Sequence, residues 1–116
     1  MGSVRVFYPK WTQEELLRRL KEGIEALAAE VPLLKVRFRV TEAWLSGSWA
    51  QGRALVGSNV DLLLLYREPR REDLHVLARR AFPGLPVELH AYTAEEAAHL
   101  ALVLERMRRG ALRLYP

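Results

Sequence analysis

The sequence predicts an α/β (α+β) fold in which helices pack on a small mixed β-sheet. Amphipathic helical segments alternate with short apolar strands along the chain, a pattern typical of a two-layer domain. Half of the 116 residues are hydrophobic, which is enough to build one core in a chain of this length. We therefore expect a single domain over residues 1–116.

The first element is predicted to be an amphipathic helix that runs to about Glu30. Thr12 and Glu15 have the spacing of a capping box, in which the two side chains each accept a backbone N–H at the helix start. Val31 and Pro32 end the helix. Apolar residues recur at helical spacing between these limits: Leu16, Leu17, Leu20, Ile24, Leu27 and Ala28.

Two strands and a short helix are predicted next. Residues 35–40 alternate strictly between basic and apolar side chains, so we expect a half-buried strand there, with extended chain continuing to Gly47. A short helix is expected over residues 48–53. The apolar run over residues 60–66 predicts a central strand that is covered on both faces.

The rest of the chain predicts a helix, a strand and a final helix. We expect a second long helix over residues 70–82, a third strand over residues 85–92 and a last helix over residues 93–109. Thr93 and Glu96 repeat the capping-box spacing at the start of the last helix. A short apolar tail follows.

The composition narrows the class of protein. Cysteine is absent, which excludes disulfides and thiolate sites. No apolar run is long enough to span a bilayer, and the first residues lack the apolar core of a signal peptide. We therefore expect a cytoplasmic protein that makes no use of a membrane.

The net charge of +4 is carried mostly by arginine, which permits phosphate-bearing partners without requiring nucleic acid. One alternative is a nucleic-acid-binding module built on the basic strand face of Lys35, Arg37 and Arg39, which would bind with a steep salt dependence. Basic and aromatic residues are not interleaved as in single-strand binders. A nucleic-acid partner is therefore not expected.

One stretch of the sequence carries chemistry. Gly47 and Ser48 form a turn that is followed, after ten residues, by Asn59-x-Asp61 at the start of the central strand. Glycine lets the backbone approach a phosphate closely, and the helix start after it offers N–H groups. Side chains at i and i+2 on a strand share one face, and carboxylate oxygens are ligands that Mg²⁺ prefers.

This stretch resembles the signature of the minimal nucleotidyltransferases, in the DNA polymerase β-like nucleotidyltransferase superfamily, which is Gly-Ser, ten residues, Asp-x-Asp. The resemblance implies a polymerase β-like palm fold, with a triphosphate bound at Gly47 and Ser48 and metal held by Asp61. Asn59 stands where the family has its first acid. Glu88 stands where the family has a third acid, usually Asp.

The resemblance also implies a reaction, which is Mg²⁺- (or Mn²⁺-) dependent transfer of a nucleoside monophosphate from a nucleoside triphosphate, with ATP expected. Asp61, Glu88 and Asn59 are the catalytic and metal-binding candidates, and Arg53 and Ser58 join the Gly-Ser pair as nucleotide-binding candidates. Because an amide carries no charge, we expect Asn59 to impair the transfer.

The function and the oligomeric state stay open at this point. In the alternative function, the chain is a catalytically degenerate, antitoxin-like binding partner of a helical HEPN-family protein. Association of the chain with copies of itself is also left open. The three histidines, His75, His90 and His99, show no metal-binding spacing, so we expect structural or surface roles for them.

Overall fold

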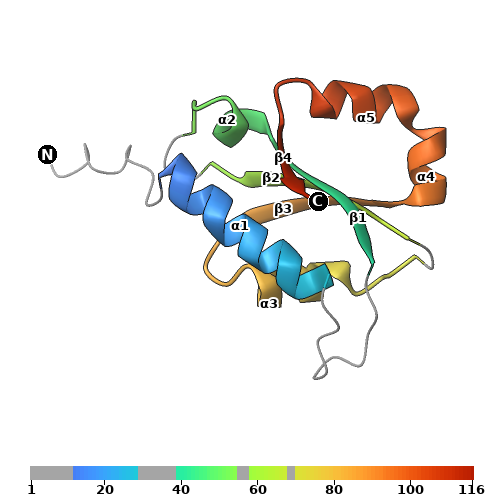
Figure 1. Ribbon diagram of the computed structural model, residues 1–116, viewed down its shortest axis with the longest axis horizontal. Coiled ribbons are helices and arrows are strands. Elements are labelled where there is room, and N and C mark those ends of the chain that lie inside the picture. The colour runs from blue at the N-terminus through green and yellow to red at the C-terminus, as the bar shows by residue number, and fades with distance from the viewer. Residues whose placement is uncertain (1–11, 29–38, 55–57, 68–69) are drawn as a thin grey trace, which may run out of the picture.

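A four-stranded mixed sheet lies at the centre of the protein (Figure 1). The computed structural model describes residues 12–28, 39–54, 58–67 and 70–116. The strands follow the spatial order β3-β2-β1-β4, and β1 pairs antiparallel with both β2 and β4, whereas β2 and β3 are parallel. Their bounds are β1 (Val40–Ser46), β2 (Val60–Tyr66), β3 (Val87–Thr93) and β4 (Leu112–Tyr115).

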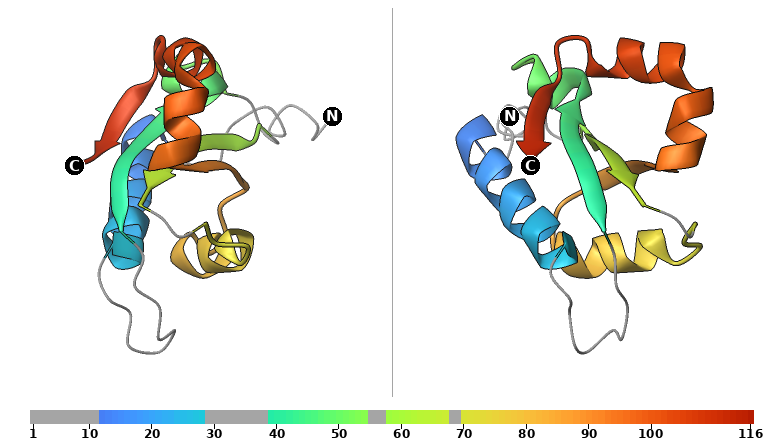
Figure 2. Two further views of the ribbon diagram at one scale, coloured as in Figure 1. Left: turned by 90° about the vertical axis from the view of Figure 1, so that its right-hand side faces the viewer. Right: turned by 45° about the vertical axis from the view of Figure 1, so that its right-hand side comes forward.

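Helices cover both faces of this sheet (Figure 2). The parallel pairing of β2 and β3 needs a crossover connection, and α3 lies in that connection. The helices on one face are α1 (Gln13–Ala28) and α3 (Leu74–Ala81), and those on the other are α4 (Ala94–His99) and α5 (Ala101–Arg108). A single short turn of helix, α2 (Gly47–Ala50), joins β1 to the loop before β2. The predicted mixed sheet with packed helices is confirmed.

Strand β2 is the middle of the core, as its apolar run predicted. Its alternate residues Leu62 and Leu64 pack in the larger core cluster with α1 and α3, while Leu63 and Leu65 face Leu104 of α5 in a second cluster. Six of the seven residues of β2 are buried, and Asp61 is the exception. A partly exposed carboxylate in an otherwise buried strand is the pattern of a functional side chain, because burial alone favours apolar residues.

Helices α1 and α3 approach each other closely because α1 contains a glycine. A Cβ built at Gly23 would overlap the ring of Phe82 and would lie 2.7 Å from the carbonyl oxygen of Ala81. Phe82 is itself buried, with 2% of its surface exposed. The sequence pattern did not predict this role, because a glycine within a helix ordinarily lowers helix stability.

Several predicted boundaries need correction. The second long helix was predicted over residues 70–82, but α3 starts only at Leu74. Before it, the Arg71 N–H donates to the Tyr66 hydroxyl and the Arg71 guanidinium pairs with Asp73, so these residues form a loop fixed by side chains. The short helix predicted over residues 48–53 is the four-residue α2.

The last predicted helix is two helices. The chain turns at Leu100, whose backbone angles of φ −112° and ψ 24° lie outside the helical range, and whose N–H donates to the Ala97 carbonyl. Leu100 packs against the second core cluster, so the break lets α4 and α5 both follow the sheet. The capping box at Thr93 and Glu96 is present in full, and the apolar tail forms β4.

The first helix agrees with its prediction over the part that is described. Thr12 accepts a hydrogen bond from the Glu15 N–H at 3.1 Å, and the buried stripe matches the predicted one. Of the strand predicted over residues 35–40, residues 35–38 lie outside the described residues, and β1 is described from Val40. Among the described residues, no helix combines the length and apolar character needed to cross a membrane.

Candidate functional site

Three strand ends meet at one edge of the sheet and gather the predicted site residues. β1 ends at Ser46, which pairs with Asp61 on β2, and Asp61 in turn pairs with Glu88 on β3. Because β2 and β3 are parallel and β1 runs opposite to them, the end of β1 meets the starts of the other two strands. Gly47, which follows Ser46, is thereby brought against Asp61.

The backbone at Gly47 lies directly on the Asp61 carboxylate. Gly47 has φ +75°, in the left-handed region, and a Cβ built there would overlap Asp61 Oδ2. Only glycine combines that backbone angle with that approach. Ser48 follows at the start of α2 and is half-buried, while the next residue, Trp49, is in the core. This arrangement explains why the Gly-Ser pair and the strand acid occur together in the sequence.

The positions of the three family acids lie in one cluster. Asp61 is 31% exposed at its side chain, and Glu88, its register partner on β3, is exposed. The Asn59 amide Nδ2 donates a hydrogen bond of 3.3 Å to Glu88 Oε2. Asn59 therefore donates a hydrogen bond to a carboxylate, which an ionised aspartate in its place has no proton to do.

A histidine that the sequence interpretation left aside joins this cluster. His90 Nε2 lies 3.7 Å from Asp61 Oδ1. His90 is two residues after Glu88 on β3, so both side chains point to the same face of the sheet. The expectation of a structural or surface role for His90 missed the spacing Glu88-x-His90 in a strand, which places both side chains on one face.

The donor set of the cluster fits a divalent cation. Among the described residues, Asp61, Glu88 and His90 form a group whose potential ligand atoms all lie within 4.8 Å of one another. Two carboxylates and an imidazole are groups that bind divalent metal ions in proteins. Asp61 and Glu88 would hold a cation by their carboxylate oxygens. The hydrogen bond from the Asn59 amide to Glu88 Oε2 would keep the Glu88 carboxylate in place.

The remaining predicted nucleotide-binding residues flank the cluster. Arg53 is exposed, and its backbone N–H donates to the Ser48 carbonyl at 2.8 Å, which keeps it at the end of α2. Ser58 is half-buried and directly precedes Asn59. The described geometry thus brings Gly47, Asp61, Asn59 and Glu88 together, and it places Arg53 and Ser58 on the neighbouring segments.

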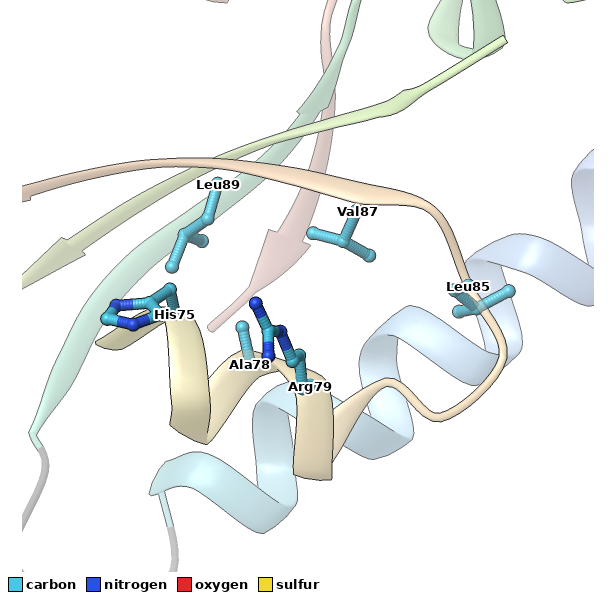
Figure 3. A pocket seen from close by; sticks show the side chains of 6 residues that line it. All are labelled: His75, Ala78, Arg79, Leu85, Val87 and Leu89. Atoms are coloured by element: carbon cyan, nitrogen blue, oxygen red, sulfur yellow. The ribbon is translucent and has the colours of Figure 1, made fainter. Parts of the chain in front are cut away.

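A pocket on the other face of β3 is separate from this cluster (Figure 3). It has a volume of about 240 Å³ and is lined by His75, Ala78, Arg79, Leu85, Val87 and Leu89. Val87 and Leu89 alternate with Glu88 and His90 along the strand, so they point to the opposite face. This pocket therefore does not adjoin the carboxylates.

The shifted carboxyl pKa values lie at helix starts outside the cluster. A hydrogen bond from the Thr93 backbone N–H lowers the pKa of Glu96, which caps α4. A hydrogen bond from the Arg71 guanidinium lowers the pKa of Asp73, which precedes α3. Both carboxylates are held charged by structural partners.

Comparison with known proteins identifies a family and a fold for this chain. A family model described as a nucleotidyltransferase domain matches residues 24–105. The chain is also similar to the crystal structure of a "putative nucleotidyltransferase from Sulfolobus solfataricus", with a TM-score of 0.58 and 22% sequence identity over 88% of this chain and 81% of that chain. At this identity the likeness is one of fold. No curated protein matches the sequence.

The family match extends over more than half of the chain and includes Gly47, Asp61, Glu88 and His90. The solved structure shares the fold that presents these residues at one sheet edge. The protein belongs to the nucleotidyltransferase domain family, in the DNA polymerase β-like superfamily.

Proposed function

We propose that this domain transfers a nucleoside monophosphate from a nucleoside triphosphate, with ATP as the expected nucleotide, to an acceptor, and that Asn59 lowers its activity. The observation that carries the proposal is the contact of the Gly47 backbone with the Asp61 carboxylate, with Glu88 beside it on the next strand. A glycine turn and two strand acids at one point are what a polyphosphate bound with a cation requires.

Each residue has a defined part in this proposal. Asp61 and Glu88 hold Mg²⁺ (or Mn²⁺), which when bound neutralises the negative charge that develops on the phosphates. Gly47 allows the chain to lie close to the triphosphate. The Ser48 hydroxyl and the N–H groups at the start of α2 donate to phosphate oxygens, because such N–H groups have no partner within a helix.

Asn59 is the residue that limits the activity. Asp61 and Glu88 together carry two negative charges, and a third acid at position 59 would add one more. The Asn59 amide instead donates to Glu88 Oε2, so one lone pair of that carboxylate is engaged by a neutral group. A site with less negative charge binds dications more weakly.

Asn59→Asp is expected to raise Mg²⁺-dependent incorporation of labelled nucleotide by about tenfold or more, because it restores a charge beside the cation. The measurement is transfer from α-labelled ATP, over a range of Mg²⁺ concentrations. Gln51→Glu is a matched control, since it makes the same chemical change at an exposed position after α2 and should leave transfer unchanged. Equal activity of Asn59→Asp and the original protein would contradict the proposed role of Asn59.

A second candidate function is favoured by an exposed apolar surface on α5. Leu102 is 75% exposed and Val103 is 48% exposed, and they are neighbours on a helix whose other face packs on the sheet. Adjacent exposed apolar side chains can form part of a contiguous patch, and contiguous apolar patches mark protein-binding surfaces. Together with Asn59, this surface supports a binding role with a helical HEPN-family protein.

Leu102→Glu is expected to weaken binding to such a partner by at least tenfold, because a charge would be placed in an apolar contact. The measurement is the Kd for a purified helical protein of the HEPN family, by isothermal titration. Val76→Glu is the matched control, since Val76 is an exposed valine on α3. Loss of partner binding in both variants, or in neither, would count against this α5 surface.

A further inference from the structure

The imidazole of His90 has no part in the nucleotidyl transfer proposed above, although it lies beside the acids. We propose that His90 is a third cation ligand, and that the cluster of Asp61, Glu88 and His90 binds a first-row transition dication such as Mn²⁺ or Co²⁺ more tightly than Mg²⁺. This inference rests on the proposed function for the location of the site, and it adds which cation the site selects.

The register of the sheet places His90 where it can share an ion with Asp61. On the parallel strands β2 and β3, Asp61 lies opposite Glu88. His90 is two residues beyond Glu88 on β3, on the same face of the sheet. The side chains of His90 and Asp61 are 33% and 31% exposed. Both side chains project from strands that fix their backbone positions, and both are exposed enough for an ion from solvent to reach them.

The distance between the two side chains indicates shared coordination more than direct pairing. His90 Nε2 and Asp61 Oδ1 are 3.7 Å apart, which is too far for a hydrogen bond. Two ligands of one cation, each about 2.1 Å from it, lie no more than about 4.2 Å apart. The observed separation falls within that limit. A carboxylate oxygen of Glu88 lies within 4.8 Å of the potential ligand atoms of both His90 and Asp61.

The charges in the cluster match one dication. Asp61 and Glu88 supply two negative charges, and a neutral imidazole supplies a third ligand without further charge. Asn59 donates to Glu88 Oε2, so Oε1 can serve as the ligand atom. His90, on the next strand, thus supplies a ligand in place of the acid that is absent at position 59.

An imidazole ligand changes which cation is preferred. Mg²⁺ takes oxygen ligands almost entirely and retains several waters. Imidazole nitrogen binds first-row transition dications more tightly, with affinity rising from Mn²⁺ through Co²⁺. Replacing an acid by a histidine therefore lowers affinity for Mg²⁺ and keeps or raises affinity for the transition ions.

The test measures ion binding by the full chain without nucleotide. Isothermal titration with MnCl₂ and with MgCl₂ is expected to give a Kd for Mn²⁺ at least tenfold lower than that for Mg²⁺. His90→Asn should raise the Kd for Mn²⁺ at least tenfold and change that for Mg²⁺ less than twofold. His75→Asn and His99→Asn are matched controls, since both histidines are exposed on other elements, and they should bind Mn²⁺ as the original protein does.

A second measurement needs no variant and covers the case in which His90→Asn fails to fold. Pulsed electron paramagnetic resonance of the Mn²⁺-loaded original protein should show coupling to a directly bound imidazole ¹⁴N. Absence of that coupling, or an unchanged Mn²⁺ Kd in folded His90→Asn, overturns the inference. Neither outcome affects the proposed transfer, which fails only if Asp61→Asn leaves transfer from labelled ATP intact.

Discussion

Asp61→Asn is expected to lower cation-dependent nucleotidyl transfer by about 10²–10³-fold, which corresponds to roughly 3–4 kcal/mol of transition-state stabilisation. Asp61 is the acid that contacts the Gly47 backbone, pairs with Glu88 across the strands and faces His90. An asparagine at this position keeps the shape and removes the charge that holds the cation. The measurement is the initial rate of transfer from labelled ATP with Mn²⁺ or Mg²⁺.

The folded state should tolerate Asp61→Asn, so that the loss can be assigned to the site. The carboxylate is about one-third exposed, and the Ser46 hydroxyl donates to the Asp61 backbone carbonyl, not to its side chain. We therefore expect the free energy of unfolding, measured by urea denaturation, to change by less than about 1 kcal/mol. A large loss of stability would indicate a structural role for the carboxylate.

Asp73→Asn is the matched control for this experiment. It makes the same chemical change at the only other aspartate of the chain, whose Oδ2 pairs with Arg71 Nη2 at 2.7 Å. Loss of that part-buried ion pair costs about 1 kcal/mol of stability and should leave the transfer rate unchanged. Transfer by Asp61→Asn at the rate of Asp73→Asn would overturn the proposed function.

The sequence predicted the parts of this protein that depend on local patterns. The apolar run over residues 60–66 identified the central strand, since a strand buried on both faces shows no alternation. The capping residues Thr93 and Glu96 identified a helix start, because the capping box is made within four consecutive residues. The Gly-Ser turn and Asp61 were found by their fixed spacing.

Features that depend on tertiary contacts were missed. The proximity of His90 to Asp61 follows from the register of β3 against β2, which the spacing Glu88-x-His90 alone does not give. The turn at Leu100 divides α4 from α5, and Leu100 itself packs against the second core cluster, while the apolar spacing alone is that of one continuous helix. The need for glycine at Gly23 arises from the ring of Phe82 on a distant element.

The pair Asn59 and His90 gives the site a consistent physical interpretation. Taken by itself, the absence of an acid at position 59 predicts weaker cation binding at the site. With His90 beside Asp61, the number of ligands is restored while the negative charge stays lower. Comparing Mn²⁺ with Mg²⁺ therefore bears on activity as well as on binding, since a transfer assay in Mg²⁺ alone would underestimate a site of this composition.

Gly47→Ala is expected to disrupt both the fold and the site. An alanine at φ +75° costs about 1–2 kcal/mol because its Cβ crowds the following carbonyl. The same Cβ overlaps Asp61 Oδ2, so the partly exposed carboxylate has to turn away from the site. We expect a loss of about 1–2 kcal/mol in urea denaturation, and at least a hundredfold loss of transfer.

Gly52→Ala separates these two effects. Gly52 has nearly the same backbone angle, φ +70°, but a Cβ built there has no other atom within 4 Å. It should therefore also lose about 1–2 kcal/mol through backbone strain but keep normal transfer and Mn²⁺ binding. The difference in transfer between the two variants measures the contact of the Gly47 backbone with Asp61. If both variants lose the same stability and both keep transfer, that contact does not organise the site, and the turn requires glycine for its backbone angle alone.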